Sequence, residues 1–408
     1  MSQPSILIIT NRVPFPLNDG GNLATYSMVK GYHEAGWRVY LFSMNTTRHF
    51  ITKETLPSLF HEIDFESFEI NTDIKAVGVL INFFLSKKPN HAERFFSKQF
   101  ENRLTEIIQE FQPVVVQLES IFLSTYINSI RNITTCSIAI RLHNIEHQIW
   151  ESLAHEMKAG LKKIYLQNLA HRIKKFELEA WQIADVLIPI TQKDADCVKD
   201  NIHLVNQIVV PYGICVKERP IQNDNEAWHG YHLGAMDWVP NAEAITWFLN
   251  EVWPTLHEEL PEFQFFFAGR NMPYSFHKYH GNGVHCVGEV LDAASFIADK
   301  KMLIVPLHTG GGIRVKVLEA MAMGKLIIAT SISMQGIDEA KSGIHFLQAN
   351  TASEFRNQIV LALKDKTQAT IIAENGKKLV QEKYNEGSIM KSLDEFMRIQ
   401  INISKTQL

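Results

Sequence analysis

The chain has 408 residues, of which 46% are apolar and 21% are charged, and its formal net charge is −4. This composition is typical of a globular protein with two or three domains, not of a disordered or membrane-embedded chain. The charge balance gives no basic field that would attract nucleic acid, so we expect no nucleic-acid partner.

The cysteines and the apolar runs indicate the compartment. The four cysteines lie far apart and form no C-x-x-C pair, which argues against a zinc ribbon or a disulfide framework and indicates a reducing compartment. The opening residues, MSQPSILIITNRVPFP, lack the basic and long apolar regions of a signal peptide. The apolar run at 76–85 is too short to span a bilayer, and we expect it to form a core helix. These features predict a cytoplasmic protein.

The first half of the chain alternates apolar strands with helices. A loop with Gly20 and Gly21 follows the first strand, and a helix over 22–36 then ends at Gly36 in a C-cap role. A long helical stretch is expected over 145–183. Apolar runs predict strands at 5–10, 37–43, 113–119, 136–143 and 185–191.

A second series of the same kind follows a polar segment with prolines and a glycine near residue 215, which indicates a linker. A helix is expected over about 241–258. Strands are predicted at 230–236, 263–269, 283–288, 301–307, 325–330 and 343–348. Because buried apolar strands that alternate with helices form parallel sheets covered on both faces, we predict an α/β protein with two doubly wound domains.

The segment PLHTGGGIRVKVLEAMAMGKLIIAT, residues 306–330, joins a strand end to an apolar helix through three glycines. Ligands of open α/β sheets bind beyond the carboxyl ends of the strands. Glycines let a large group approach the backbone, and the first amides of a helix favour an anion. We expect the helix to begin near Gly312 or Ile313 and to carry Arg314 and Lys316 on its first turns, which predicts a phosphate or diphosphate site.

Glu319 follows one turn further along this expected helix. An ionised carboxylate only accepts hydrogen bonds, so it suits the paired hydroxyls of a ribose. The apolar positions form a separate core stripe, which leaves Gly312, Lys316 and Glu319 together on another face. A packing explanation also exists, because glycine-rich turns can serve packing alone and basic residues on helix surfaces are usually solvated.

The sequence resembles the GT-B glycosyltransferases, specifically the large retaining family 4, also called group 1. The resemblance covers nearly the whole chain. In the first half it rests on ITNRVPFPLNDGGNLATYSMVKGYHEAGWRVYLFS, RLHNIEHQIW and IPITQKDADCV. In the second half it rests on HLGAMDWVPNAEAITWFLNEVWP, FFFAGRNMP, CVGEV and the glycine-rich segment described above.

The resemblance implies two Rossmann-like domains that face a cleft. The first, at 1–212, would bind the acceptor, and the second, at 213–386, would bind the nucleotide sugar. A C-terminal helix at 387–408 would cross back to the first domain. By position, Glu319 would hold the ribose and His143 would lie at a strand end near the sugar. The other donor-binding positions that it implies are Gly20, Gly21, Gly234, Gly288, Glu289, Val290, Gly310, Gly311 and Gly312.

The sequence departs from the family at two places. The family motif has two glutamates separated by seven residues, and the first of them falls on Gly311 here. Many members carry basic residues just after the position of Gly234, where this chain has Ala235 and Met236.

Other basic residues of the chain are candidates to replace the missing basic residues. A departing nucleoside diphosphate gains negative charge, which a metal-free site must balance with cations. We hypothesise that Arg314 and Lys316 supply this charge, with Arg270 as a third candidate. No aspartate pair stands at a strand end, because D-A-D at 194–196 falls in the first turn of an expected helix. We therefore expect no metal and no cofactor, since the nucleotide sugar is a substrate.

The resemblance implies retention of configuration. No residue stands out as a covalent nucleophile, so we favour front-side attack in which the leaving phosphate takes the acceptor proton. His143 would then orient the sugar or the phosphate, or it is simply a hydrogen-bonded histidine at a strand end. The implied enzyme is a hexosyltransferase that uses a UDP- or GDP-linked sugar and a glycan or lipid-linked acceptor, in bacterial cell-envelope or exopolysaccharide synthesis.

Other interpretations stay open at this point. The loss of the first glutamate is also compatible with a catalytically inactive module that binds nucleotide sugars in a polysaccharide assembly complex. A GT-B sugar-nucleotide epimerase would need a carboxylate-rich site, which these strand ends do not provide. The basic amphipathic segment at 155–177 predicts either weak contact with the inner face of the plasma membrane or a solvated helix face.

Overall fold

The computed structural model describes residues 3–17, 20–72, 88–202, 206–214, 227–310 and 312–406. Contacts divide the chain into two compact units, here called the N-unit (Met1–Pro211 with Glu386–Leu408) and the C-unit (Tyr212–Asn385). The run at 76–85, expected as a core helix, lies outside the described residues. Among the helices of the described ranges, none has the length and apolar character needed to cross a membrane.

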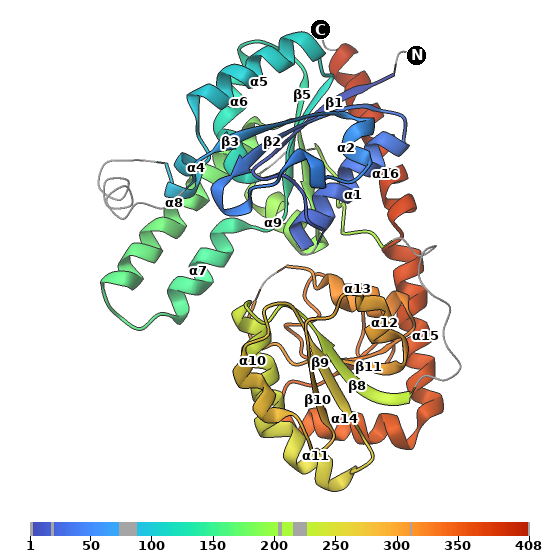
Figure 1. The fold of residues 1–408 in the computed structure, drawn as a ribbon. Coiled ribbons are helices and arrows are strands. Elements are labelled where there is room, and N and C mark those ends of the chain that lie inside the picture. The colour runs from blue at the N-terminus through green and yellow to red at the C-terminus, as the bar shows by residue number, and fades with distance from the viewer. Residues whose placement is uncertain are drawn as a thin grey trace. The chain divides into compact units, whose positions relative to one another are not determined.

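The N-unit contains a parallel sheet (Figure 1). Its strand order is β3-β2-β1-β4-β5-β6-β7. Its strands are β1 (Ser5–Thr10), β2 (Arg38–Thr46), β3 (Asp64–Ile70), β4 (Val115–Leu118), β5 (Ser137–Leu142), β6 (Val186–Pro189) and β7 (Asn206–Gln207). Strand β3 was not predicted, because its alternating sequence DFESFEI is only partly buried at the sheet edge. The order reverses between β1 and β4, and ligands of doubly wound sheets bind at such a reversal.

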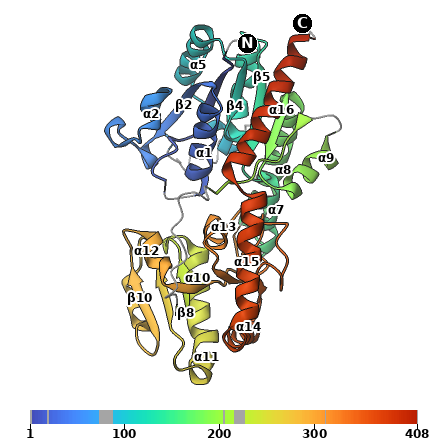
Figure 2. The same cartoon turned by 90° about the vertical axis from the view of Figure 1, so that its right-hand side faces the viewer.

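Helices cover both faces of this sheet. One face packs against α1 (Gly20–Glu34), α2 (Leu59–Glu62) and α16 (Glu386–Thr406), with α1 and α16 side by side (Figure 2). The other face packs against α4 (Asn90–Arg94), α5 (Lys98–Phe111), η3 (Ile121–Tyr126) and α6 (Ile127–Arg131). Two short 3-10 turns, η1 (Thr47–His49) and η2 (Lys53–Thr55), follow β2.

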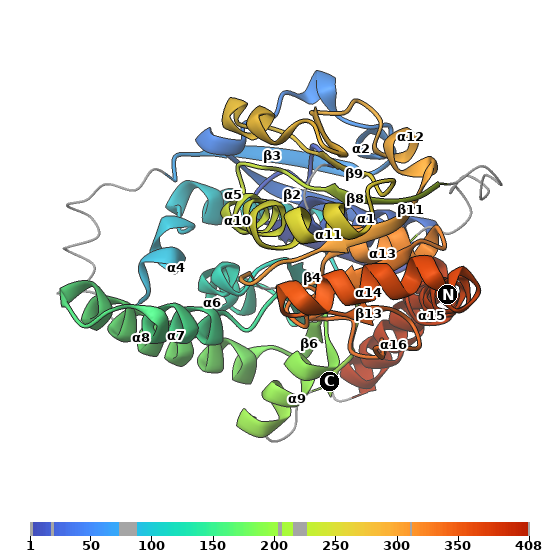
Figure 3. The same ribbon diagram turned by 90° about the horizontal axis from the view of Figure 1, so that it is seen from below.

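The segment expected as one helix over 145–183 forms two helices instead. These are α7 (Glu146–Glu156) and α8 (Leu161–Ile183), which pack side by side (Figure 3). The chain reverses at 157–160, where Gly160 has an extended backbone that interrupts the helical hydrogen bonds. The next helix, α9 (Gln192–Asn201), is capped by the Thr191 hydroxyl, which accepts from the Asp194 amide.

The C-unit contains a second parallel sheet, with the order β10-β9-β8-β11-β12-β13. Its strands are β8 (Ala227–Leu233), β9 (Phe265–Ala268), β10 (Val284–Gly288), β11 (Lys300–Val305), β12 (Leu326–Ala329) and β13 (Leu347–Gln348). The last strand is much shorter than the expected range 343–348. The order reverses between β8 and β11, so the loops after these two strands flank the predicted ligand position.

The C-unit sheet is also covered on both faces. One face packs against α10 (Val239–Trp247), the π-helical segment η5 (Phe248–Val252), α11 (Trp253–Glu259) and α14 (Ala352–Lys364). The other face packs against α12 (Ala293–Ala298) and α13 (Val315–Ala322), while α15 (Lys366–Lys383) contributes to both cores. The short helix η6 (Tyr274–Tyr279) lies between β9 and β10.

Candidate functional site

The glycine-rich loop follows β11 and leads into α13. Gly310 and Gly312 have positive φ angles of 113° and 80°, a backbone region that side chains with a Cβ atom rarely adopt. The expected helix start at Gly312 or Ile313 is wrong, because left-handed backbone at Gly312 cannot continue a helix. The helix begins at Val315 with Arg314 as its N-cap residue. Gly311 lies outside the described residues.

Arg314 is 7% exposed and folds back over this loop. Its Nη1 donates to the Gly312 carbonyl at 3.1 Å, and its guanidinium lies 5.3 Å from the centre of the Trp238 ring. A Cβ atom at Gly310 would lie 2.8 Å from Arg314 Nη2, so the glycine also makes room for the guanidinium. Burial lowers the pKa of Arg314 to about 10, which still leaves this side chain charged at neutral pH.

Lys316 lies in the first turn of α13 and reaches two side chains from neighbouring elements. Its Nζ is 3.0 Å from His232 Nε2 and 3.0 Å from Asn241 Oδ1. His232 is fully buried on β8, with Nδ1 2.8 Å from the Ile304 carbonyl on β11. Since a carbonyl can only accept, His232 carries its proton on Nδ1 and accepts from Lys316 at Nε2.

Both of these partners of the Lys316 ammonium are neutral. Burial, and then the charge of Arg314, lower the pKa of Lys316 to about 7. Burial and the charge of Lys316 hold the pKa of His232 well below its ordinary value, so His232 does not add a third charge. Within the described ranges, no carboxylate forms an ion pair with Lys316. The positive charge at this strand reversal would therefore be stabilised by an anion.

The backbone around the end of β8 is tightly packed. A Cβ atom at Gly234 would lie 2.6 Å from Asn241 Nδ2, which donates to the Ala235 carbonyl at 2.9 Å. A Cβ atom at Gly269 would lie 1.7 Å from the Gly234 carbonyl oxygen. Gly234 and Gly269 therefore allow the ends of β8 and β9 to approach each other next to Asn241, which fixes the position of Lys316.

Except for Glu319 on α13, the remaining predicted donor residues of the C-unit lie at or just beyond the ends of β9 and β10. The Arg270 side chain is 42% exposed and lies 3.9 Å from the Asp237 carboxylate, so a carboxylate and solvent already balance its charge. Gly288 ends β10 with a φ of 82°, and Glu289 and Val290 follow it at the surface. Glu319 lies on α13 and is partly exposed.

In the N-unit, the predicted residues lie at the reversal between β1 and β4 and on the next strand. Gly20 and Gly21 are the first two residues of α1, not part of the preceding loop as expected. His143 directly follows β5, its side chain is 25% exposed, and its Nε2 lies 3.2 Å from Glu119 Oε2. Glu119 directly follows β4 and is buried.

Comparison with known proteins gives one family. Residues 230–365 match the family described as glycosyl transferases group 1. Over 265 residues the chain is 24% identical to an uncharacterised 44.6 kDa protein in the cps region of Klebsiella pneumoniae. That match covers 62% of this chain and 66% of the relative, slightly less than two thirds.

Solved structures with low sequence identity share the fold along nearly the whole chain. Sucrose-phosphate synthase from Thermosynechococcus elongatus has a TM-score of 0.71 at 16% identity, covering 98% of this chain and 100% of that one. HepE from Anabaena in complex with UDP has a TM-score of 0.66 at 13% identity, covering 97% and 99%. The chain is therefore similar to the glycosyl transferases of group 1 over residues 230–365. The predicted fold class, a GT-B protein with two Rossmann-like sheets, is confirmed.

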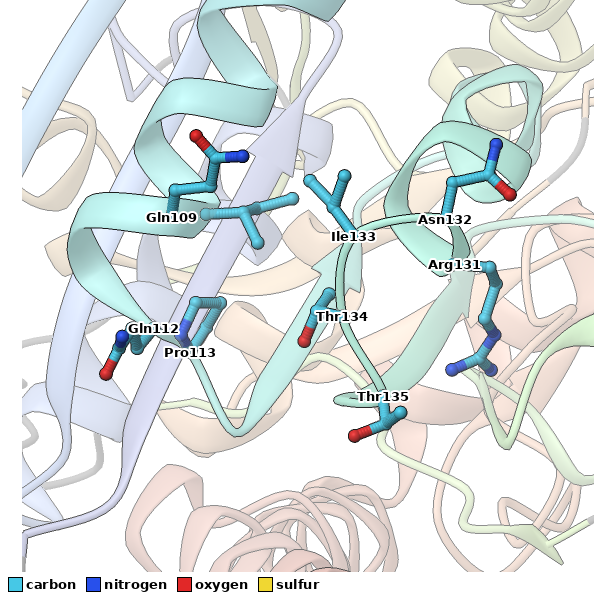
Figure 4. A pocket seen from close by; sticks show the side chains of 9 residues that line it. Gln109, Gln112, Pro113, Arg131, Asn132, Ile133, Thr134 and Thr135 are labelled. Atoms are coloured by element: carbon cyan, nitrogen blue, oxygen red, sulfur yellow. The ribbon is translucent and has the colours of Figure 1, made fainter.

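A cavity of about 610 Å³ lies away from the strand ends described above (Figure 4). It opens where α5 leads into β4 and α6 leads into β5, at the amino ends of these strands. Arg131 lines it and pairs with the Asp185 carboxylate. In the described ranges no group of three or more histidines, cysteines and acidic residues is placed to hold a metal.

Three residues that organise the two strand reversals were not predicted from the sequence. They are His232, Asn241 and Glu119. A polar or ionisable residue inside or directly after an apolar strand was a usable signal, as in GYHLG at 230–234 and VVVQLE at 114–119. The partners could not be deduced, since they depend on which strands become neighbours in the sheet.

Proposed function

We propose that this chain is a retaining glycosyltransferase that moves a sugar from a UDP- or GDP-linked donor to a hydroxyl group of a glycan or lipid-linked acceptor. One observation carries the proposal. Two basic residues, the buried Arg314 and the partly buried Lys316, stand beside glycines with positive φ at the sheet reversal, and both hydrogen-bond partners of Lys316 among the described residues are neutral. A donor diphosphate would supply a negative charge beside the Lys316 ammonium.

The same residues suit the transfer step. Breaking the bond between the sugar and the diphosphate leaves additional negative charge on the departing phosphate, which nearby cations stabilise. Arg314 and Lys316 take this role in place of the family's bases, and Glu319 holds the ribose hydroxyls. In front-side attack, the departing phosphate oxygen takes the acceptor proton, so no separate protein base is needed. His143 orients the sugar in this scheme.

The relatives support the donor class and the setting. HepE has been solved with UDP and with UDP-glucose, which makes a nucleotide sugar the first donor class to test. The relative from Klebsiella lies in a cps region, which supports a role in envelope or exopolysaccharide synthesis. We place the enzyme in the cytoplasm, with weak contact to the inner membrane surface through α8, where Ile164 is 58% exposed beside Lys162 and Lys163.

A binding panel tests the proposal. UDP, GDP, ADP and their common sugars are compared by calorimetry and thermal shift, with and without EDTA. A ligand at 100 times its dissociation constant should stabilise the fold by about 2.7 kcal/mol. We expect one nucleotide to bind equally with EDTA and to lose affinity in Glu319→Ala. Absence of any nucleotide binding overturns the proposal, and tight binding without transfer to any acceptor favours the inactive donor-binding module.

A further inference from the structure

A single buried carboxylate, Glu119, joins several elements at the carboxyl end of the N-unit sheet. Its Oε1 accepts from Gln117 Nε2 at 2.5 Å. Its Oε2 accepts from Thr25 Oγ1 at 3.1 Å and lies 3.2 Å from His143 Nε2. Arg141 Nη1 lies 3.6 Å from the same oxygen. The Glu119 side chain is 1% exposed, so these groups replace water as its partners.

The charge of Glu119 decides which nitrogen of His143 carries a proton. Burial acts to raise the pKa of Glu119, but the Arg141 guanidinium and the hydrogen bonds from His143 and Gln117 outweigh it and hold the pKa below its ordinary value. An ionised carboxylate can only accept. His143 must therefore donate from Nε2, and in the neutral imidazole Nδ1 is then a bare acceptor.

The other side of the imidazole is available to a ligand. The His143 side chain is 25% exposed, and no hydrogen bond joins its Nδ1 to any of the described residues. We propose that Glu119 is the positioning residue of His143, and that it fixes the Nε2–H tautomer so that Nδ1 accepts a hydrogen bond from a sugar hydroxyl. The choice of a sugar hydroxyl as ligand rests on the proposed glycosyltransferase function, whereas the tautomer does not.

The same carboxylate fixes the start of α1. Thr25, which donates to Glu119, lies in this helix, and Arg141 Nη1 also donates to the Ala24 carbonyl at 3.0 Å. The Gly20–Gly21 end of α1 and the His143 ring are therefore held by one hydrogen-bonded group. A buried network of this kind places a side chain more precisely than a loop alone, because several hydrogen bonds from different elements hold its members.

The tautomer can be measured without any ligand. Nitrogen-15 NMR of histidine-labelled protein distinguishes a protonated Nδ1 from a protonated Nε2, and His143→Gln assigns the signal. We expect the full-length protein to show the Nε2–H form at His143. In Glu119→Gln, the amide can donate as well as accept, so we expect this preference to weaken or reverse. An Nδ1–H signal in the wild-type protein overturns the proposal, even if Glu119→Gln does not fold.

A matched control separates positioning from general stability. Asp185→Asn removes a carboxylate that pairs with Arg131 and accepts from the Ile138 amide at the opposite end of the same sheet. This variant is expected to leave the His143 signal unchanged. An equal change of the His143 signal in Glu119→Gln and in Asp185→Asn contradicts a specific role for Glu119.

Turnover gives a second readout once the binding panel has identified the donor. We expect Glu119→Gln to lower kcat by about 10–100-fold, by analogy with the loss seen when the outer hydrogen-bond partner of a metal-bound histidine is removed. Glu119→Gln and His143→Gln together should cost little more than the larger single effect, because they act through one group. Additive losses overturn the positioning role. If no nucleotide binds, the proposed function fails while the NMR result on Glu119 still stands.

Discussion

The charged side chains at the two strand reversals of this protein differ in whether the fold supplies a partner of opposite charge. In the N-unit, the buried Glu119 carboxylate is matched by Arg141 and by hydrogen bonds from several elements. In the C-unit, the hydrogen-bond partners of the Lys316 ammonium among the described residues are His232 and Asn241, and both are neutral. A charge that the fold has already balanced serves to position other residues. A charge that the fold leaves unbalanced favours a ligand of opposite sign, at a cost to the empty protein.

This comparison predicts its largest effect for Arg141→Met. The substitution leaves the Glu119 carboxylate buried without its cation, and breaking a buried pair in this way typically costs about 3–5 kcal/mol. Urea unfolding of the full chain measures the loss. As a control, Arg131→Met breaks the more exposed pair with Asp185, where about 1 kcal/mol or less is expected. Similar losses for the two variants would show that burial of the pair does not set its importance.

Lys316→Met should lower turnover strongly and change stability little, unlike Arg141→Met. It removes a partly buried cation together with its two hydrogen bonds, so we expect a smaller change in stability than for Arg141→Met. Turnover should fall by about 10²–10³-fold, the usual effect of removing one group that stabilises developing negative charge. Steady-state transfer kinetics provide the measurement.

Lys325→Met is the matched control for Lys316→Met. Lys325 is 2% exposed and donates to the Ala298 carbonyl, but it precedes β12 at the amino end of the strand. Its replacement should leave turnover near the wild-type value in whatever fraction of the protein folds. Wild-type turnover in Lys316→Met would remove this residue from the proposed mechanism.

The sequence predicted the parallel α/β architecture because most strands are short apolar runs between helices and glycine-containing turns. Prediction failed where the local pattern was weak, as in β3, whose charged residues hide a strand at the sheet edge. It also failed at the break between α7 and α8, which depends on how the two helices pack against each other.

The candidate site was predictable only in part. The glycines before α13 and the basic residues after them are local signals, so Gly310, Gly312, Arg314 and Lys316 could be named from the sequence. The neutral hydrogen-bond partners of Lys316 come from β8 and the start of α10, 75 or more residues earlier in the chain. Whether a charged residue meets a group of opposite charge depends on which strands become neighbours in the sheet, and a local sequence pattern does not predict this.

The pKa of Lys316 predicts a pH dependence of donor binding. With a pKa of about 7 in the empty protein, this side chain is charged below pH 7 and becomes neutral above it. A diphosphate favours the charged form, so its binding raises the pKa and takes up a proton. The dissociation constant of the identified nucleotide sugar should be constant below pH 7 and rise by about tenfold per pH unit just above it.

A nucleotide sugar is the suitable probe for this titration, because its diphosphate has no free terminal phosphate that ionises near neutral pH. Calorimetry in buffers with different ionisation enthalpies should also detect the proton uptake. While donor binding weakens as the pH rises, the stability of the ligand-free protein should increase. Lys316 binds fewer protons when folded than when unfolded between pH 7 and 10.5, so its contribution to stability rises with pH in this range. An affinity that does not change up to pH 9, or a dependence that persists in Lys316→Met, contradicts this assignment.

The smallest effect, and the most direct test of the comparison, is expected for Asn241→Asp. This change places a carboxylate where Asn241 Oδ1 now lies, 3.0 Å from Lys316 Nζ, and so gives the C-unit a balanced pair like that of the N-unit. The new carboxylate should raise the pKa of Lys316, move the pH dependence to higher values and weaken nucleotide-sugar binding. We expect the affinity to fall by roughly tenfold, about 1.5 kcal/mol, the scale of one hydrogen bond to a charged group. Asn241→Ala removes the same amide and its bond to the Ala235 carbonyl without adding a charge, so the difference between the two variants isolates the charge. If Asn241→Asp binds donor as tightly as Asn241→Ala and keeps a pH midpoint near 7, the unbalanced charge of Lys316 is not what attracts the diphosphate.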